Sequence, residues 1–188
     1  MNAMAQAAQR MTADEYLAIP YDGRRTMLVE GEVVVNQSRV LHQYVVADLL
    51  DAVRAWAAAA PGRGCATLPI DVKLDDGNVF GPDVLWYAER RVPGRHDPRP
   101  YPIPDLAVEV RSPSTWRYDI GAKKAAYERA GLPELWLVDT TASEVIVFRR
   151  SSPKASTFDD ALELTVDDEL TSPQLPGFAL ALSTLFVD

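Results

Sequence analysis

Hydrophobic residues recur at helical spacing in three parts of the chain. Residues 11–19 predict a short helix with Thr12 as its N-cap, and Glu15 follows three positions later, a spacing typical of a capping box. Residues 118–130 form a second periodic segment that stops at Gly131, a residue suited to a left-handed helix end. The longest predicted helix covers residues 40–60, with apolar positions at Leu41, Val45, Val46, Leu49, Leu50, Val53 and Trp56.

Between these helices the pattern changes to short runs typical of β-strands. Turn residues separate the runs in two places, which predicts β-hairpins over residues 27–35 and over residues 67–87. The strands expected after them are residues 106–110, 134–139, 144–149 and 162–166, before a short closing helix within residues 176–186. Helices that alternate with strands predict an α/β fold with a central mixed β-sheet flanked by helices.

Composition and charge narrow the class of protein. With 188 residues and 47% hydrophobic residues, the chain can bury a sizeable core, so we expect a flexible N-terminus over residues 1–11 and one domain over residues 12–188. No apolar run is long enough to span a membrane and Cys65 is alone, so a cytoplasmic protein without disulfides is expected. The net charge of −8 disfavours a protein that coats nucleic acid without sequence preference, because such a protein needs a basic surface. It does not exclude a nuclease, since the electrostatic field at one site can differ from that of the whole surface.

Two carboxylates occupy positions that call for a partner. Glu109 lies inside the apolar run Leu106–Val110, and Asp83 follows Pro82 at the start of another predicted strand. A buried ionised carboxylate must be paired or must bind a cation, and Mg²⁺ accepts two carboxylates while keeping several waters. The alternatives are an ion pair between Glu109 and Arg111, and a simple turn position for Asp83.

The helix after the Glu109 strand adds a cation. Asp119, Lys123 and Tyr127 stand at i, i+4 and i+8, so they share one helix face. This spacing also fits an ordinary surface ion pair. If the face points inward, Lys123 can reach the carboxylates, and phosphoryl transfer uses such a set of metal-binding carboxylates and a cation.

These motifs, in this order, resemble the Uma-two family of restriction endonucleases, within the PD-(D/E)XK nuclease superfamily. The resemblance covers residues 12–150 and includes the Glu30-Gly31 hairpin and His42 at the head of the long helix. It implies a restriction-endonuclease-like core in which Asp83 and Glu109 bind Mg²⁺ or Mn²⁺ and Lys123 is the catalytic cation. Accessory roles are then expected among Arg111, Asp119, Tyr127, His42 and Glu30.

The sequence departs from the family pattern at two places. Met27 stands where the family hairpin carries an acidic residue, and Arg111 stands where the superfamily has a lysine two residues after the glutamate. Arg111 is therefore either a substitute cation, a phosphate contact or a residue that pairs with Glu109. His42 is either a general base or a helix-start residue with a local hydrogen bond.

The function expected from the sequence is a metal-dependent endonuclease that hydrolyses DNA. Arg95 in the basic loop of residues 90–99, together with Arg117 and Lys124, would contact the DNA backbone. A homodimer is expected by analogy. Two alternatives stay open: a nuclease-fold binding module with little activity, and a hydrolase of small phosphate esters.

Overall fold

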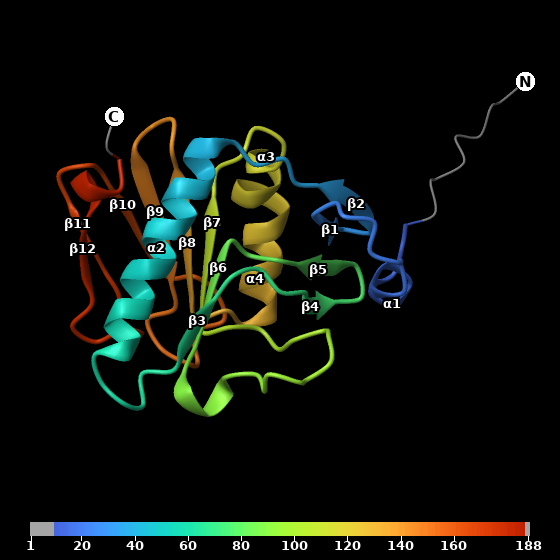
Figure 1. The fold of residues 1–188 in the computed structure, drawn as a ribbon, viewed down its shortest axis with the longest axis horizontal. Coiled ribbons are helices and arrows are strands. Elements are labelled where there is room, and N and C mark those ends of the chain that lie inside the picture. The colour runs from blue at the N-terminus through green and yellow to red at the C-terminus, as the bar shows by residue number, and fades with distance from the viewer. Residues whose placement is uncertain (1–9, 187–188) are drawn as a thin grey trace, which may run out of the picture.

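The computed structural model describes residues 10–186 and is built around a six-stranded mixed sheet (Figure 1). Its strand order is β10-β9-β8-β7-β6-β3, and within this sheet β7 and β8 are the parallel neighbours. The strands are β3 (Cys65–Thr67), β6 (Val84–Tyr87), β7 (Leu106–Val110), β8 (Glu134–Asp139), β9 (Glu144–Arg149) and β10 (Asp160–Leu164). The predicted mixed sheet is confirmed. The predicted flexible N-terminus falls mostly on residues outside the described part, and the single domain and the homodimer stay predictions.

Helices cover both faces of this sheet. Figure 1 shows α2 (Val40–Ala58) crossing the front of the sheet, where Leu49 and Val53 join a core with Val108 and Trp136. On the other face α4 (Lys124–Ala130) packs its Tyr127 in a second core. Side chains alternate between the two faces along a strand. In β7, therefore, Val108 and Val110 face α2, while Ala107 and Glu109 face α4.

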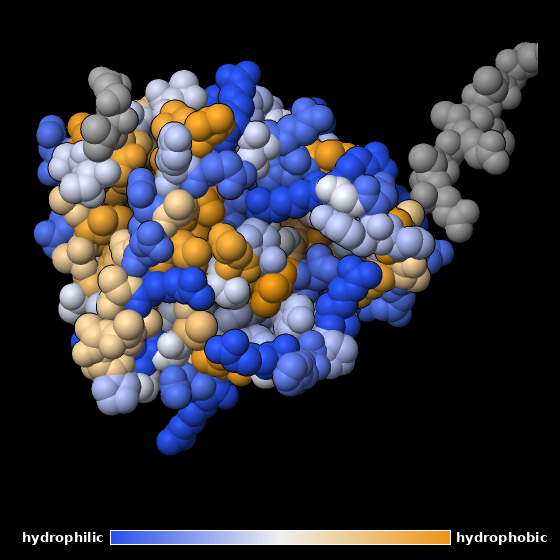
Figure 2. Space-filling model, viewed as in Figure 1, coloured by the Kyte–Doolittle hydropathy of each residue, from blue (hydrophilic) through white to orange (hydrophobic). Residues whose placement is uncertain are grey.

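A smaller sheet carries the N-terminal part of the chain, in the order β2-β1-β5-β4. Its strands are β1 (Thr26–Val29), β2 (Glu32–Val35), β4 (Val72–Asp75) and β5 (Asn78–Phe80). Helix α1 (Ala13–Leu17) begins with the expected capping box between Thr12 and Glu15, and its Ala13 and Tyr16 pack on this sheet. Figure 2 shows mainly hydrophilic residues over this part of the molecule and more hydrophobic ones over the face that carries α2.

The prediction of one long hairpin over residues 67–87 was wrong in its extent. Each arm is divided: β3 and β6 pair in the large sheet, whereas β4 and β5 pair in the small one. Pro69 and Pro82 lie at the two breaks. Because proline has no N–H to donate to a β-ladder, each arm leaves one sheet there and enters the other.

The helix expected over residues 118–130 also differs from a regular α-helix. It begins earlier, with α3 (Trp116–Tyr118), continues as a π-helical segment (Asp119–Lys123) and ends as α4 at Gly131, which has φ +86°. The wider π turn inserts one residue into the helix, a feature found at many functional sites.

The C-terminal region holds two strands that the hydrophobic pattern did not indicate. They are β11 (Glu169–Thr171) and β12 (Ala179–Ala181), and they pair with each other. The expected closing helix is only the 3₁₀ turn Leu182–Thr184. Strands of three residues are too short to give a readable alternation. Within residues 10–186, no helix is long and apolar enough to cross a membrane.

Gly131→Ala is expected to lower the free energy of unfolding by about 1 kcal/mol, because the Cβ of an alanine in the left-handed conformation crowds the backbone. Its added methyl would meet no atom within 4 Å, so crowding contributes nothing. Gly121→Ala is the matched control, since Gly121 also has open space but no positive φ. Urea unfolding should show a loss for the first variant only. Equal stability of Gly131→Ala and wild type would contradict this reading of the helix end.

Candidate active site

Asp83 is fixed at the point where the chain enters β6. Its backbone N–H donates to the Val108 carbonyl at 2.8 Å, and its Oδ2 accepts from the Val110 N–H at 2.8 Å. Its Oδ1 accepts from Arg25 Nη2 at 2.9 Å and lies 3.3 Å from His42 Nε2. Burial would raise the pKa of this carboxyl, but His42, Arg25 and the Val110 amide outweigh burial and lower it. Asp83 is therefore a buried carboxylate that keeps its charge.

Glu109 lies on the neighbouring strand β7 and is 4% exposed. Its Oε1 accepts from the Tyr127 hydroxyl at 2.6 Å and lies 2.7 Å from Lys123 Nζ. Burial raises the pKa of Glu109 to about 7; Lys123 opposes the rise, and the charges of Asp119 and Asp83 add to it. Because Asp83 accepts from the N–H of Val110, the residue next to Glu109, the two carboxylates belong to one cluster.

Lys123 supplies the buried cation of this cluster and is 1% exposed. Its ammonium lies 2.7 Å from Asp119 Oδ1 as well as 2.7 Å from Glu109. Asp119 Oδ2 in turn accepts from the Thr115 hydroxyl at 3.0 Å, and Thr115 shares a hydrogen bond with Ser112 at 2.7 Å. Burial would lower the pKa of Lys123, but the two carboxylates outweigh burial and raise it. The ammonium is therefore held charged, in a fixed position, without solvent.

Residues 13–183 match the Uma2 family, which is described as a putative restriction endonuclease. The chain belongs to the Uma2 family. The resemblance of the sequence motifs to Uma-two proteins is thereby confirmed.

A solved structure has the same fold as this chain. The crystal structure of a putative nuclease belonging to DUF820 from Anabaena variabilis ATCC 29413 superposes with a TM-score of 0.77. The two chains are 17% identical, and the match covers 94% of this chain and 97% of the other. At this identity the likeness establishes the fold and nothing finer. Among curated proteins, none matches the sequence.

The structure brings the helix face predicted from the spacing together with Glu109. Asp119, Lys123 and Tyr127 all point inward, and Lys123 and Tyr127 both contact Glu109. The alternative of a plain surface ion pair is wrong, because Asp119 and Lys123 are each 1% exposed. The spacing therefore placed these residues correctly, even though the helix contains a π turn.

The two residues expected to depart from the family pattern, Arg111 and Met27, have partners of their own. Arg111 pairs with both oxygens of Asp139, at 2.9 and 2.7 Å, and its guanidinium covers the Trp116 ring. The expectation that Arg111 could pair with Glu109 was therefore wrong. Met27 is a buried residue of β1 and packs with apolar residues rather than supplying an acid.

His42 and Glu30 have opposite outcomes. The expected local hydrogen bond of His42 is wrong, because the buried ring contacts residues that are far away in the sequence. Its Nε2 lies 3.3 Å from Asp83 Oδ1, and its Nδ1 lies 3.4 Å from the Arg111 carbonyl. Interaction with Asp83 outweighs burial and raises the pKa of His42. Glu30 is exposed at the β1–β2 turn, where its backbone N–H donates to Asn78. His42 is therefore part of the cluster, and Glu30 is not.

The three side chains expected to contact DNA do not converge on the carboxylates. The loop with Arg95 joins the end of β6 to the start of β7, whereas Asp83 and Glu109 lie toward the opposite ends of these strands. Arg117 is bound to the neighbouring Tyr118 hydroxyl. Lys124 lies 3.7 Å from Glu128 and over the Phe148 ring, away from Glu109.

Two residues of the cluster gave no usable signal in the sequence. Arg25 stands in a loop 58 residues before its partner Asp83, so no spacing rule connects them. Thr115 ends the stretch Ser112-Pro113-Ser114-Thr115 after β7, and its hydrogen bond to Asp119 depends on the turn between β7 and α3. Both contacts arise from tertiary structure rather than local pattern.

The raised pKa of Glu109 predicts a pH effect on stability. An unfolded glutamate ionises near 4.5, whereas the folded one keeps its proton to about 7. Between these values the folded state binds more protons, so stability falls as pH rises through the window. In urea unfolding at a series of pH values, Glu109→Gln should lose less stability than wild type across this window. Parallel profiles for the two proteins would contradict the prediction.

Proposed function

We propose that the protein is a divalent-metal-dependent endonuclease that hydrolyses DNA phosphodiester bonds. The observation that carries the proposal is the buried Glu109–Lys123–Asp119 arrangement beside Asp83. Three carboxylates gather here around two permanent cations, Lys123 and Arg25, and His42 lies beside Asp83. Membership of a family described as restriction endonucleases supports the same reaction class.

The donor set fits a hard divalent cation. Asp83 and Glu109 offer carboxylate oxygens, and no described residue donates a hydrogen bond to Glu109 Oε2. Within residues 10–186 there is no cluster of three or more His, Cys, Asp or Glu side chains that could enclose a metal ion. Mg²⁺ and Mn²⁺ suit a site of two carboxylates, because Mg²⁺ in particular binds few protein ligands and keeps several waters. Asp83 and Glu109 would hold the ion.

A divalent ion held there would polarise the scissile phosphate and lower the pKa of a bound water. The remaining chemistry belongs to side chains of this protein. Lys123 offers a positive charge to the phosphate oxygens, where charge builds up during hydrolysis. Tyr127 fixes Glu109 by its short hydrogen bond, and Thr115 fixes Asp119, which in turn places Lys123.

Nicking of supercoiled plasmid tests this function. Wild-type protein is expected to nick the plasmid in Mn²⁺ or Mg²⁺ and to stop when EDTA removes the metal. Asp83→Asn should remove the activity, because it takes away one of the two charged ligands while keeping the side-chain shape. Nicking that persists in EDTA, or equal nicking by Asp83→Asn, would refute the proposal.

One observation favours a second candidate, a nuclease-fold binding module with little activity. Both oxygens of Asp83 already have protein partners, Val110 N–H on one side and Arg25 and His42 on the other. In that case the protein would bind nucleic acid without nicking it under any metal. Calorimetry of Mn²⁺ binding separates the two candidates. The enzyme requires a metal ion at Asp83, whereas the binding module does not.

A further inference from the structure

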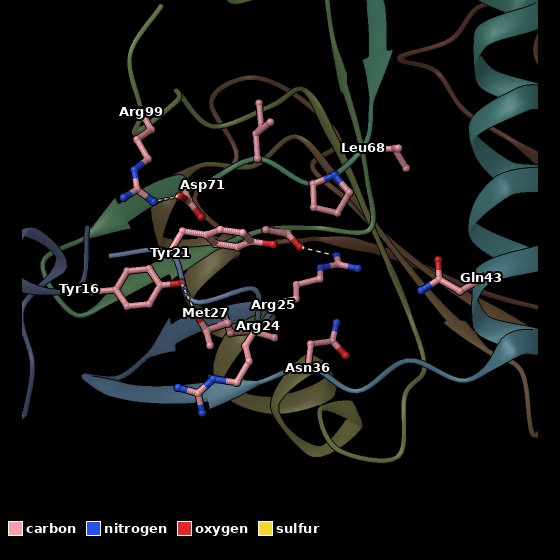
Figure 3. A pocket seen from close by; sticks show the side chains of 14 residues that line it. Tyr16, Tyr21, Arg24, Arg25, Met27, Asn36, Gln43, Leu68, Asp71 and Arg99 are labelled. Atoms are coloured by element: carbon pink, nitrogen blue, oxygen red, sulfur yellow. Dashed lines mark hydrogen bonds and ion pairs between the residues drawn. The ribbon is translucent and has the colours of Figure 1, made fainter. Parts of the chain in front are cut away.

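A cavity of about 450 Å³ lies beside the carboxylate cluster, between α2, the start of β1 and the segment that joins β3 to β4. Figure 3 shows Tyr21 across the middle of this cavity, with Arg25 next to it and Gln43 extending from α2. Its lining includes three arginines, Arg24, Arg25 and Arg99, and one aspartate, Asp71. Each arginine pairs with an acidic residue: Arg24 with Asp22, Arg99 with Asp71 and Arg25 with Asp83.

Arg25 connects the cavity to the cluster. Its Nη2 donates to Asp83 at 2.9 Å and to the Gly81 carbonyl at 3.2 Å. No described residue accepts a hydrogen bond from the other two nitrogens of this guanidinium, and the side chain is 36% exposed. These free donors suit a phosphate group, which guanidinium binds through two parallel hydrogen bonds.

Other residues of the cavity suit the base of a nucleotide. Tyr21 is 84% exposed, so its ring offers a face on which a base can stack. Asn36 Oδ1 is buried and has no hydrogen-bond partner among the described residues, so it can accept from an amino group. Leu68 is 52% exposed on the cavity wall, which adds apolar contact.

We propose that this cavity binds one unstacked nucleotide of a DNA strand, with its phosphate on Arg25 and its base on Tyr21. The proposal rests on the proposed nuclease function, since it makes the cavity the neighbour of the scissile phosphate. The phosphate would have to compete with Asp83 for Arg25. A cation bound at Asp83 weakens the hold of Asp83 on Arg25, so metal binding and phosphate binding should support each other.

Fluorescence anisotropy with a labelled single-stranded oligonucleotide of about a dozen nucleotides tests the cavity directly, in EDTA so that no cleavage occurs. Tyr21→Ala and Arg25→Gln are each expected to weaken binding about tenfold or more. Arg95→Gln is the matched control, because it removes one exposed arginine at the opposite ends of β6 and β7; its affinity should equal that of wild type. Circular dichroism confirms that the variants are folded.

The results separate this proposal from the proposed function. Wild-type affinity in both Tyr21→Ala and Arg25→Gln would overturn the cavity proposal even if the enzyme nicks plasmid. An equal loss in Arg95→Gln would also overturn it, because binding would then reflect charge alone. Loss of binding in the two cavity variants, in a protein that never nicks plasmid, would support the cavity and refute the nuclease. A third measurement, Mn²⁺ affinity, should be unchanged in Tyr21→Ala.

Discussion

Glu109→Gln is expected to lower metal-dependent nicking by about two orders of magnitude or more while leaving the fold intact. Glutamine has the same shape and keeps a carbonyl oxygen that can accept from Tyr127 and Lys123. It cannot supply the negative charge that a divalent cation requires. Lys123 keeps Asp119 as its partner, so no buried charge is left alone. The variant should therefore lose metal binding and activity without losing stability.

The measurement is the initial nicking rate in Mn²⁺, together with Mn²⁺ titration by calorimetry. Glu134→Gln is the matched control: Glu134 is also a fully buried glutamate on a strand of the same sheet. Glu134 accepts from Trp136 and Ser172 and lies at the start of β8, so its replacement should leave nicking per folded molecule unchanged. Full activity in Glu109→Gln, or equal losses in the two variants, would remove Glu109 from the site.

Lys123→Met is expected to reduce turnover by about 10²–10³-fold and to reduce stability by about 3 kcal/mol at neutral pH. Methionine fills similar space but leaves the carboxylates of Glu109 and Asp119 without their shared cation. Two buried like charges repel, so they should take up protons more readily and the stability loss should shrink at lower pH. Mn²⁺ affinity should not fall, because the lysine competes with a metal ion for Glu109.

Lys124→Met is the control for this prediction, since Lys124 is the next residue along the helix and lies near Glu128 instead. It should change turnover and stability little. The double variant Lys123→Met with Asp119→Asn should recover stability but not turnover. Recovery of both would make Lys123 a structural residue, and a drop in Mn²⁺ affinity larger than the drop in turnover would do the same.

The sequence predicted those parts of the molecule that repeat locally. The apolar stripe of α2 and the buried run of β7 placed the core, because each pattern covers enough residues to exclude other structures. Asp119, Lys123 and Tyr127 were grouped by helical spacing alone. Their meeting with Glu109 could be expected because the helix follows β7 directly along the chain.

The remaining features depend on contacts between distant segments. The hydrophobic pattern of residues 67–87 is the same for a hairpin in one sheet and for a hairpin divided between two sheets. The division at Pro69 and Pro82 therefore depends on tertiary packing. From the sequence, Glu109 was the nearby acid that Arg111 could pair with. The parallel pairing of β7 with β8 instead brings Arg111 to Asp139. The cavity around Tyr21 is formed by several segments that are far apart in the sequence, none of which has a distinctive motif.

The division of the hairpin between two sheets has a mechanical consequence. Asp83 stands at the joint, three residues after the end of β5 in the small sheet and directly before β6 in the large sheet. Arg25 precedes β1 of the small sheet, so its ion pair with Asp83 spans that joint. Asp83 itself is bound to β7 of the large sheet through Val108 and Val110, so any rocking of the small sheet would move Arg25 relative to Asp83 while Asp83 and Glu109 keep their spacing. The angle between the two sheets therefore sets how closely the Arg25 guanidinium approaches the Asp83 carboxylate, and so how much of the Asp83 charge is neutralised.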